Sequence, residues 1–536
     1  MLTPDFNLFV FPGRIARLAL SLVCLLGAGW ATLSAESSGI APVVTVTGGQ
    51  IRGRLLPEGH GAVFKGIPFA QPPVGILRWR EPEPVRPWRG IREAGLSGPP
   101  AAQPSQGWNE RFAKASREDC LYLDVWTPSG PSKTRKPVMV WVHGGANVAG
   151  AGGADSLYDG QPLISHDVVL VVIEYRLGIF GFFAHPELTK ESPHRSSGNY
   201  GLLDQLAALR WVRDNIATFG GDPDNVTLFG QSAGSIDVLA LMTSPLSRGL
   251  FHRAIAESGP LFPGMFKPLS EVEQAGLRLV EQLPTASPKG LAHLRTLSTE
   301  ELLKINTIGA VEGIDGWVIP ADPAEVMSAG KAQPLPLIIG SNAIEFPAPG
   351  SVADIKNNIQ TNFGELTPRA LTLYGLAEGS APSVADPVYG DLADQWGAEA
   401  FRSFGIIQGG RHAAAGNQVW EYEFDRAIPP RTKVGHSSEL PYVFGNLYAE
   451  GFQAGDFQSA DHKLSGSIQA YWTNFAKIGN PNGLGLPLWP TYDDKARKFI
   501  RLTTAAEIQV GENQRGPFCD LFRELLKKPA AAQKQR

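Results

Sequence analysis

The stretch "VTLFGQSAGS", Val226 to Ser235, carries an apolar run into a turn with a serine between two glycines. The run "NVTLFG" is typical of a buried strand, and "SAGSIDVLALMTS", which begins at Ser232, is typical of a helix. The pentapeptide "GQSAG" fits the pattern G-x-S-x-G, in which a strand-to-helix turn lifts a serine side chain. Glycine tolerates the close approaches of such a turn. Ser232 is therefore a candidate nucleophile, and the alternative interpretation is a structural turn serine.

Strand and helix patterns alternate on both sides of this turn. Short apolar runs typical of strands buried on both faces occur at residues 137–145, 168–176 and 335–342. Residues 199–220 have apolar positions at helical spacing and end in glycine. The alternation predicts an α/β fold with a central, mostly parallel sheet flanked by helices. Helical patterns at about 268–334 and 352–410 predict helical insertions, which we expect over the active site.

The N-terminus has the organisation of a secretory signal peptide. Two arginines precede the apolar run "LALSLVCLLGAGWA" at residues 18–31, and small residues follow up to Ala35. We therefore predict a signal peptide at residues 1–35, a folded domain at residues 36–536, and a secreted or periplasmic protein. No stable membrane insertion is expected after removal of the signal. The alternative is an uncleaved membrane anchor.

Composition narrows the possible partners and cofactors. The chain has 536 residues, 43% of them hydrophobic, and a formal net charge of -4, which gives no reason to expect a nucleic-acid partner. No metal-binding motif occurs, and we predict neither a metal nor another cofactor. Of the three cysteines, Cys24 lies in the leader, so Cys120 and Cys519 could form one disulfide at most.

A nucleophilic serine needs a base, an acid that orients the base, and backbone donors for the oxyanion. Candidate donors lie in "HGGAN" at residues 143–147, directly after a predicted strand. "GSNAIE" at 340–345 places a carboxylate after another strand, and "GHSSELPYVFGN" at 435–446 places a histidine in a loop. The chain order serine, acid, histidine is that of α/β-hydrolases.

Several longer blocks carry a resemblance to a known family. These are "FKGIPFAQPPVGILRW" (64–79), "EDCLYLDVWTP" (118–128), "NYGLLDQLAALRWVRDNIATFGGDPDNVTLFGQSAG" (199–234) and "ELPYVFG" (439–445). They resemble the type-B carboxylesterases, which include cholinesterases and many bacterial esterases. The resemblance covers residues 43–522 and implies an α/β-hydrolase fold. It also implies a serine carboxylesterase that hydrolyses small-molecule esters through an acyl-enzyme, without a cofactor.

The resemblance assigns a role to each candidate site residue. Ser232 matches the nucleophile, His436 the general base and Glu345 the acid that orients the histidine. The backbone N–H groups that match the oxyanion hole are those of Gly145, Ala146 and Ala233. His143 is expected to support the oxyanion loop.

The loops near the candidate nucleophile depart from the family pattern. Ala146 replaces a common third glycine, and its N–H remains a donor if its φ is negative. Asn147 replaces a common aromatic residue, so it either alters the acyl side of the pocket or is a loop residue. Gln231 replaces the usual glutamate, and a neutral amide is cheaper to bury than a carboxylate. We expect function to be retained with altered local electrostatics.

The candidate acid and the cysteines also depart from the pattern. Ile344 and Phe346 flank Glu345 where Asp and Gly are common, which leaves Asp354 as the alternative acid. Glu439 is expected to be a structural partner of the histidine loop. Cys120 matches a family cysteine whose upstream partner is missing here, so a buried thiol is expected, with pairing to Cys519 as the alternative.

The same apparatus allows other functions. One is hydrolysis of amides or carbamates, or acyl transfer to an alcohol. Another is a lipase that acts at lipid surfaces. A third, from a different class, is a non-catalytic cholinesterase-like binding protein.

Overall fold

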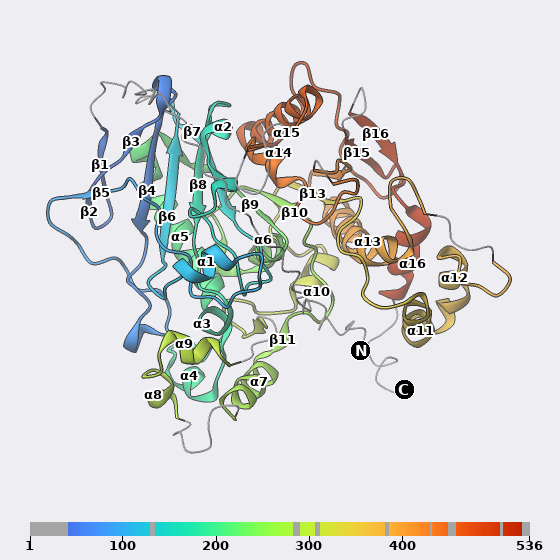
Figure 1. The fold of residues 1–536 in the computed structure, drawn as a ribbon, viewed down its shortest axis with the longest axis horizontal. Helices are drawn as coiled ribbons and strands as arrows, with labels where there is room; N and C mark the ends of the chain where they lie inside the picture. Colours follow the sequence, from blue (N-terminus) through green and yellow to red (C-terminus); the bar gives the residue numbers. More distant parts are fainter. Residues whose placement is uncertain are drawn as a thin grey trace, which may run out of the picture.

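The computed structural model describes residues 41–128, 134–281, 290–305, 311–380, 385–428, 431–448, 457–503 and 508–527. The predicted signal peptide at residues 1–35 lies outside these ranges. Figure 1 shows a large sheet with helices on both faces, as the alternating pattern predicts.

The main sheet of the described chain has eleven strands in the order β16-β15-β14-β13-β10-β9-β7-β8-β6-β4-β3. Pairing is parallel from β8 through β7, β9, β10, β13 and β14 to β15, and antiparallel at both edges. This confirms the expected mostly parallel sheet. The strands are β3 (Arg54–Leu55), β4 (Ala62–Pro68), β6 (Tyr122–Thr127), β7 (Lys136–Val142), β8 (Val169–Ile173), β9 (Gly221–Gln231), β10 (Arg253–Glu257), β13 (Leu337–Asn342), β14 (Val419–Phe424), β15 (Lys498–Leu502) and β16 (Gln509–Glu512).

Two smaller sheets accompany it. Strands β1 (Val43–Val46) and β2 (Gly49–Arg52) form an antiparallel hairpin, and β5 (Ile91–Glu93) pairs with β2. Strand β11 (Lys267–Pro268), at the start of the first helical insertion, pairs with β12 (Gly313–Ile314), which lies within that insertion.

The continuous apolar runs form strands because both of their faces are buried. In β7, Val138, Val140 and Val142 belong to one hydrophobic cluster, whereas Met139 and Trp141 belong to a second one. Successive side chains of a strand point to opposite faces, so the two clusters lie on the two sides of the sheet. Burial of each such side chain contributes about 1.5–3 kcal/mol.

Helices cover each face. Side chains of α5 (Tyr200–Asn215), α6 (Ala233–Thr243), α13 (Leu392–Ala414) and α16 (Gly516–Leu525) join the first cluster. Those of α14 (Leu440–Phe444) and α15 (Ser459–Ile478) join the second cluster, together with α2 (Gln161–Ile164). The short helices α1 (Glu110–Ala115), α3 (Gly178–Phe182) and α4 (Pro186–Glu191) lie in the loops between strands.

The two expected insertions are helical. The first contains α7 (Leu269–Glu281), α8 (Leu291–Leu294), α9 (Thr299–Leu303) and α10 (Pro323–Ser328). The second contains α11 (Val352–Asn362) and α12 (Thr367–Leu373) and leads into α13. In Figure 1, α7, α8 and α9 gather at the bottom of the view, and α11 and α12 lie at the lower right.

Cys120 and Cys519 are both buried and free. The alternative in which they form a disulfide is therefore wrong, and the buried Cys120 thiol is as expected. No helix in the described ranges has the length and apolar character needed to cross a membrane. Within the same ranges, no group of three or more His, Cys, Asp or Glu side chains is arranged to hold a metal ion.

Candidate active site

Ser232 occupies the turn between β9 and α6 in a strained conformation, with φ 57° and ψ -125°. Its N–H donates to the carbonyl of Glu257 at 2.9 Å, and its own carbonyl accepts from Ile236 N at 3.0 Å. A Cβ on Gly234 would lie 2.2 Å from the Val142 carbonyl oxygen, so only glycine lets the turn pack against the end of β7. Backbone strain held by surrounding contacts is typical of functional sites.

The histidine and the candidate acid lie in contact. His436 Nδ1 is 2.6 Å from Glu345 Oε2, and the His436 N–H donates to the Glu345 carbonyl at 3.0 Å. The other carboxylate oxygen of Glu345 accepts from Asn342 N at 2.8 Å, at the end of β13. An ionised carboxylate only accepts, so Nδ1 carries the proton and Nε2 is left as the acceptor.

Asp354, the alternative acid, lies elsewhere. It is the third residue of α11, where its carboxylate accepts from the N–H and the hydroxyl of Ser351 in an exposed capping box. Such a contact stabilises the first turn of a helix. In the described chain it is Glu345 that contacts the histidine.

The side chain beside the serine, rather than the serine itself, contacts the histidine. Gln231 Nε2 lies 3.1 Å from His436 Nε2, and because that nitrogen is an acceptor, the amide donates to it. Within the described residues no hydrogen bond joins Ser232 Oγ to the imidazole. Catalytic hydrogen bonds are often formed only when substrate is bound.

The loop after β7 has three successive residues with positive φ: Gly145 at 110°, Ala146 at 55° and Asn147 at 56°. The positive φ of Ala146 does not meet the condition under which its N–H was expected to remain a donor. The physical reason is a tight turn, in which Val148 N and Ala149 N both donate to the Gly145 carbonyl at 3.1 and 3.0 Å. In the described chain the N–H groups of Gly145 and Ala146 have no protein acceptor. Ala233, the first residue of α6, has an N–H without an intrahelical partner.

His143 lies beneath this loop. Its ring stacks on Tyr175 at 4.5 Å, and its Nδ1 lies 2.8 Å from the Gly144 carbonyl, to which it donates. Burial lowers the pKa of His143 to about 4, so the ring is neutral. These contacts agree with the expected supporting role.

Two further buried carboxyl groups lie close to the candidate triad. Glu439 accepts from Asn342 Nδ2 at 2.7 Å, which links the histidine loop to β13. Burial, followed by the charge of Glu345, raises the pKa of Glu439 to about 7. Glu257, at the end of β10, accepts from Trp472 Nε1 at 2.7 Å, and burial raises its pKa well above the ordinary value. Sequence analysis missed Glu257, although a carboxyl group in the apolar run "RAIAESG" was a usable signal.

An aromatic group lies against the histidine. The ring of Phe346 is 4.1 Å from that of His436, and the ring of Phe401, on α13, is 5.7 Å away. Phe401 also meets Phe262 edge-on at 5.4 Å. Sequence analysis missed Phe262 and Phe401, because no local pattern marks a contact between residues so far apart in the chain.

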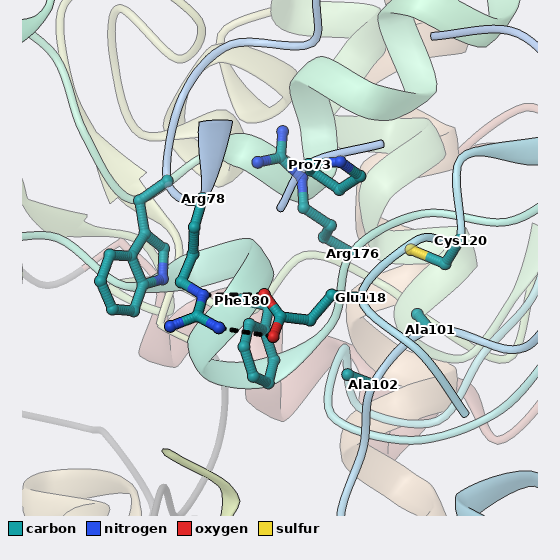
Figure 2. A pocket seen from close by; sticks show the side chains of 9 residues that line it. Pro73, Arg78, Ala101, Ala102, Glu118, Cys120, Arg176 and Phe180 are labelled. Carbon is teal, nitrogen blue, oxygen red and sulfur yellow. Dashed lines mark hydrogen bonds and ion pairs between the residues drawn. The ribbon is translucent and has the colours of Figure 1, made fainter. Parts of the chain in front are cut away.

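A separate crevice shows where two of the sequence blocks of the resemblance meet. Figure 2 shows Arg78 pairing with Glu118 through two hydrogen bonds of 2.7 and 2.6 Å, with Cys120 nearby. Burial raises the pKa of the Cys120 thiol well above its usual range, which disfavours the thiolate form that would act as a nucleophile. The crevice contains none of the candidate catalytic residues. It is lined by Pro73, Arg78, Trp79, Ala101, Ala102, Glu118, Cys120, Arg176 and Phe180.

The α/β-hydrolase fold with a serine on the strand-to-helix turn defines the class of the protein as a carboxylic-ester hydrolase of the serine esterase type. The family model described as "Carboxylesterase family" matches residues 40–372 and 394–522. The chain belongs to the carboxylesterase family.

Individual relatives are similar over nearly the whole chain. Cocaine esterase of Homo sapiens is 35% identical, over 91% of this chain and 92% of its own length. Fumonisin B1 esterase of Sphingopyxis macrogoltabida is 34% identical, over 92% of each. Among solved structures, a PNB esterase superposes with a TM-score of 0.75 and 32% identity, over 91% of this chain and all of its own.

Proposed function

We propose that this protein is a secreted or periplasmic carboxylesterase that hydrolyses small-molecule esters through Ser232, His436 and Glu345. The observation that carries the proposal is the buried 2.6 Å contact between Glu345 Oε2 and His436 Nδ1, next to a serine on a strained turn. The carboxylate fixes the imidazole tautomer, and the turn presents the hydroxyl.

In the first half of the reaction, Ser232 Oγ attacks the ester carbonyl carbon, and His436 Nε2 takes the hydroxyl proton. The negative charge that develops on the carbonyl oxygen is met by the N–H groups of Gly145, Ala146 and Ala233. Each such donor is worth about 3 kcal/mol in the transition state. His436 then gives its proton to the leaving alkoxide, and the alcohol departs from an acyl-enzyme.

In the second half, His436 takes a proton from a water molecule, which attacks the acyl carbon. The same donors hold the second oxyanion. Collapse of this intermediate returns the proton to Ser232 Oγ and releases the carboxylic acid. Glu345 stays ionised throughout and stabilises the imidazolium.

The first experiment treats purified protein and Ser232→Ala with an organophosphate and measures intact mass. Turnover of p-nitrophenyl acetate and butyrate is measured alongside. We expect one adduct on the unmodified protein, none on the variant, and a loss of several orders of magnitude in hydrolysis with the fold unchanged. No adduct and no turnover in well-folded protein would instead favour the binding-protein alternative.

Further assays separate the remaining alternatives. A jump in activity above the solubility limit of the ester would favour a lipase, and faster turnover of the matching amide would favour an amidase. Export is tested by N-terminal sequencing of protein expressed with residues 1–35 in place. A mature chain that still begins at Met1 would contradict the signal peptide.

A further inference from the structure

The side chain of Asn147 is enclosed beneath the oxyanion loop, with 1% of its surface exposed. Its Nδ2 donates to Asp237 Oδ1 at 3.0 Å and to Glu312 Oε1 at 2.8 Å. The single hydroxyl hydrogen of Tyr175 is shared between Asn147 Oδ1 at 2.9 Å and the His143 carbonyl at 2.7 Å. Both hydrogens of the amide and its oxygen are therefore engaged, and the residue does not line the acyl side of the site.

These partners come from different parts of the fold. Asp237 lies on α6, one turn after Ala233, whereas Glu312 immediately precedes β12 within the first insertion. Tyr175 follows β8. The backbone carbonyl of Asn147 accepts from Gly178 N at 2.6 Å, at the start of α3. One residue thus ties the oxyanion loop to the helix that carries the third oxyanion donor.

The loop needs such a tether. Ala146 and Asn147 both have positive φ, at 55° and 56°. A left-handed conformation costs an ordinary residue about 1–2 kcal/mol, and it persists only where the surroundings impose it. The bonds to the Asn147 side chain supply that constraint, and the direction of the adjacent Ala146 N–H depends on it.

The two carboxyl groups that hold Asn147 form an isolated pair. Asp237 is fully buried and Glu312 is 3% exposed. In the described chain neither has an ion pair with a cation, and the titratable groups that face Asp237 are Glu312 and Tyr175. Gln205 Nε2 donates to Asp237 Oδ2 at 2.5 Å. Burial, followed by the charge of Glu312, raises the pKa of Asp237 to about 8, and burial also raises the pKa of Glu312.

We propose that Asn147 is a positioning residue for the oxyanion hole, and that one proton on the Asp237–Glu312 pair, whose carboxyls are bridged by the Asn147 amide, keeps it in place. This rests on the proposed esterase function. With that proton present, the pair carries one charge and both carboxyls accept from the amide. Removal of the proton leaves two negative charges in a low-dielectric site, which repel each other and drive α6 away from the segment before β12. The donors then miss the transition-state oxygen.

The first test compares Asn147→Gly with Asn446→Gly. Glycine accepts the left-handed backbone without strain, so only the tether is lost. We expect kcat for p-nitrophenyl butyrate to fall about 10- to 100-fold, with KM changed less than about threefold, since the oxyanion exists only in the transition state. Asn446 is an equally buried control that donates to the carbonyls of Leu157 and Asp159. Its variant should lose thermal stability but keep kcat within about twofold.

An unchanged kcat in Asn147→Gly, or an equal loss of kcat in both variants, would overturn the positioning role. Organophosphate labelling of the unmodified protein separates this result from the proposed function. An adduct on Ser232 with normal turnover in Asn147→Gly overturns the positioning role alone. The absence of any adduct overturns both.

The second test measures kcat against pH in Asp237→Asn. The unmodified enzyme should lose kcat above about pH 8, whereas the variant has no second charge to gain and should keep its plateau to higher pH. Glu312→Gln removes the other carboxyl that accepts from Asn147, and it should likewise keep its kcat plateau to higher pH. If both variants keep the alkaline loss of kcat at its original position, the proton on the Asp237–Glu312 pair does not hold the loop.

Discussion

At the scale of single residues, both carboxylate oxygens of Glu345 have a hydrogen-bond partner. Oε1 accepts from the backbone of Asn342 and Oε2 contacts His436 Nδ1. The side chain has no solvent exposure, so water does not compete for either oxygen. The residue therefore has one orientation, and that orientation determines which imidazole nitrogen faces the serine.

Glu345→Gln tests this directly. An amide nitrogen opposite Nδ1 favours the tautomer with the proton on Nε2, which is unable to accept the serine proton. We expect kcat/KM for p-nitrophenyl butyrate to fall by up to about 10⁴-fold with the melting temperature little changed. Asp354→Asn is the control, since Asp354 caps an exposed helix. A loss in the control equal to that in Glu345→Gln would show that the acid is wrongly assigned.

At the scale of elements, α13 is the helix that covers the acid loop. A Cβ on Gly397 would lie 1.7 Å from the Phe346 carbonyl oxygen, so the helix backbone rests directly on the residue after Glu345. Two turns further on, Gly405 has ordinary space, with Ile339 at 3.8 Å. The same helix thus has one glycine, Gly397, without room for a Cβ and another, Gly405, with room for one.

Gly397→Ala should push α13 off the acid loop. We expect a loss of about 1–3 kcal/mol in unfolding free energy, as for overpacking in a core, and at least a tenfold loss of kcat as Glu345 moves. Gly405→Ala should be neutral or should stabilise by up to about 1 kcal/mol, because alanine is the better helix former. Urea unfolding and initial rates measure both effects. Equal behaviour of the two variants would contradict the contact between α13 and the acid loop.

Elements were more predictable from the sequence than the contacts between them. The runs that became β7, β8, β9 and β13 are apolar because both faces of the sheet are covered, and that burial is visible as composition. The turn at Ser232 is marked by its glycines. The pairing of Glu345 with His436 followed from the family resemblance, and the structure places the two residues in contact.

The remaining features depend on distant contacts. Asn147 bonds to Glu312, 165 residues away, and Phe401 reaches His436 from α13. No periodicity encodes such pairs. The positive φ of Ala146 depends on how the following loop closes onto Gly145, which the residue types alone do not determine.

At the scale of the whole molecule, the fold buries many carboxyl groups without pairing each one with a cation. Burial raises the pKa of Asp124 to about 6, that of Glu439 to about 7 and that of Asp237 to about 8. Other carboxyls, such as Asp520 beside Arg497, have a lowered pKa because of their cationic partner. The carboxyls with a raised pKa and those with a lowered pKa make opposite contributions to the pH dependence of stability.

A carboxyl with a raised pKa binds its proton more tightly in the folded state than in the unfolded chain. It stabilises the fold fully below its unfolded value of about 4, and this stability is lost as the pH rises through the folded value. The carboxyls with lowered pKa stabilise the fold above about pH 4 and lose that contribution in acid. The carboxyls with raised pKa therefore increase the unfolding free energy as the pH falls from 8 to about 5, and those with lowered pKa decrease it below about pH 4. Buried His143, with its lowered pKa, acts against the first group between about pH 6.5 and pH 4.

Asp124→Asn isolates one contribution. Asp124 lies on β6, where Gly66 N donates to it at 2.7 Å, and asparagine keeps the shape and an acceptor oxygen. Between about pH 4 and pH 6 one such carboxyl gives a slope of up to about 1.4 kcal/mol per pH unit. Urea unfolding at pH 4.5, 5.5, 6.5 and 7.5 should show a flatter dependence in the variant over the lower part of this range. Parallel curves for the two proteins would mean that Asp124 is ionised in the folded state, and that the hydrogen bonds from Ser97 and Gly66 offset the cost of burying its charge.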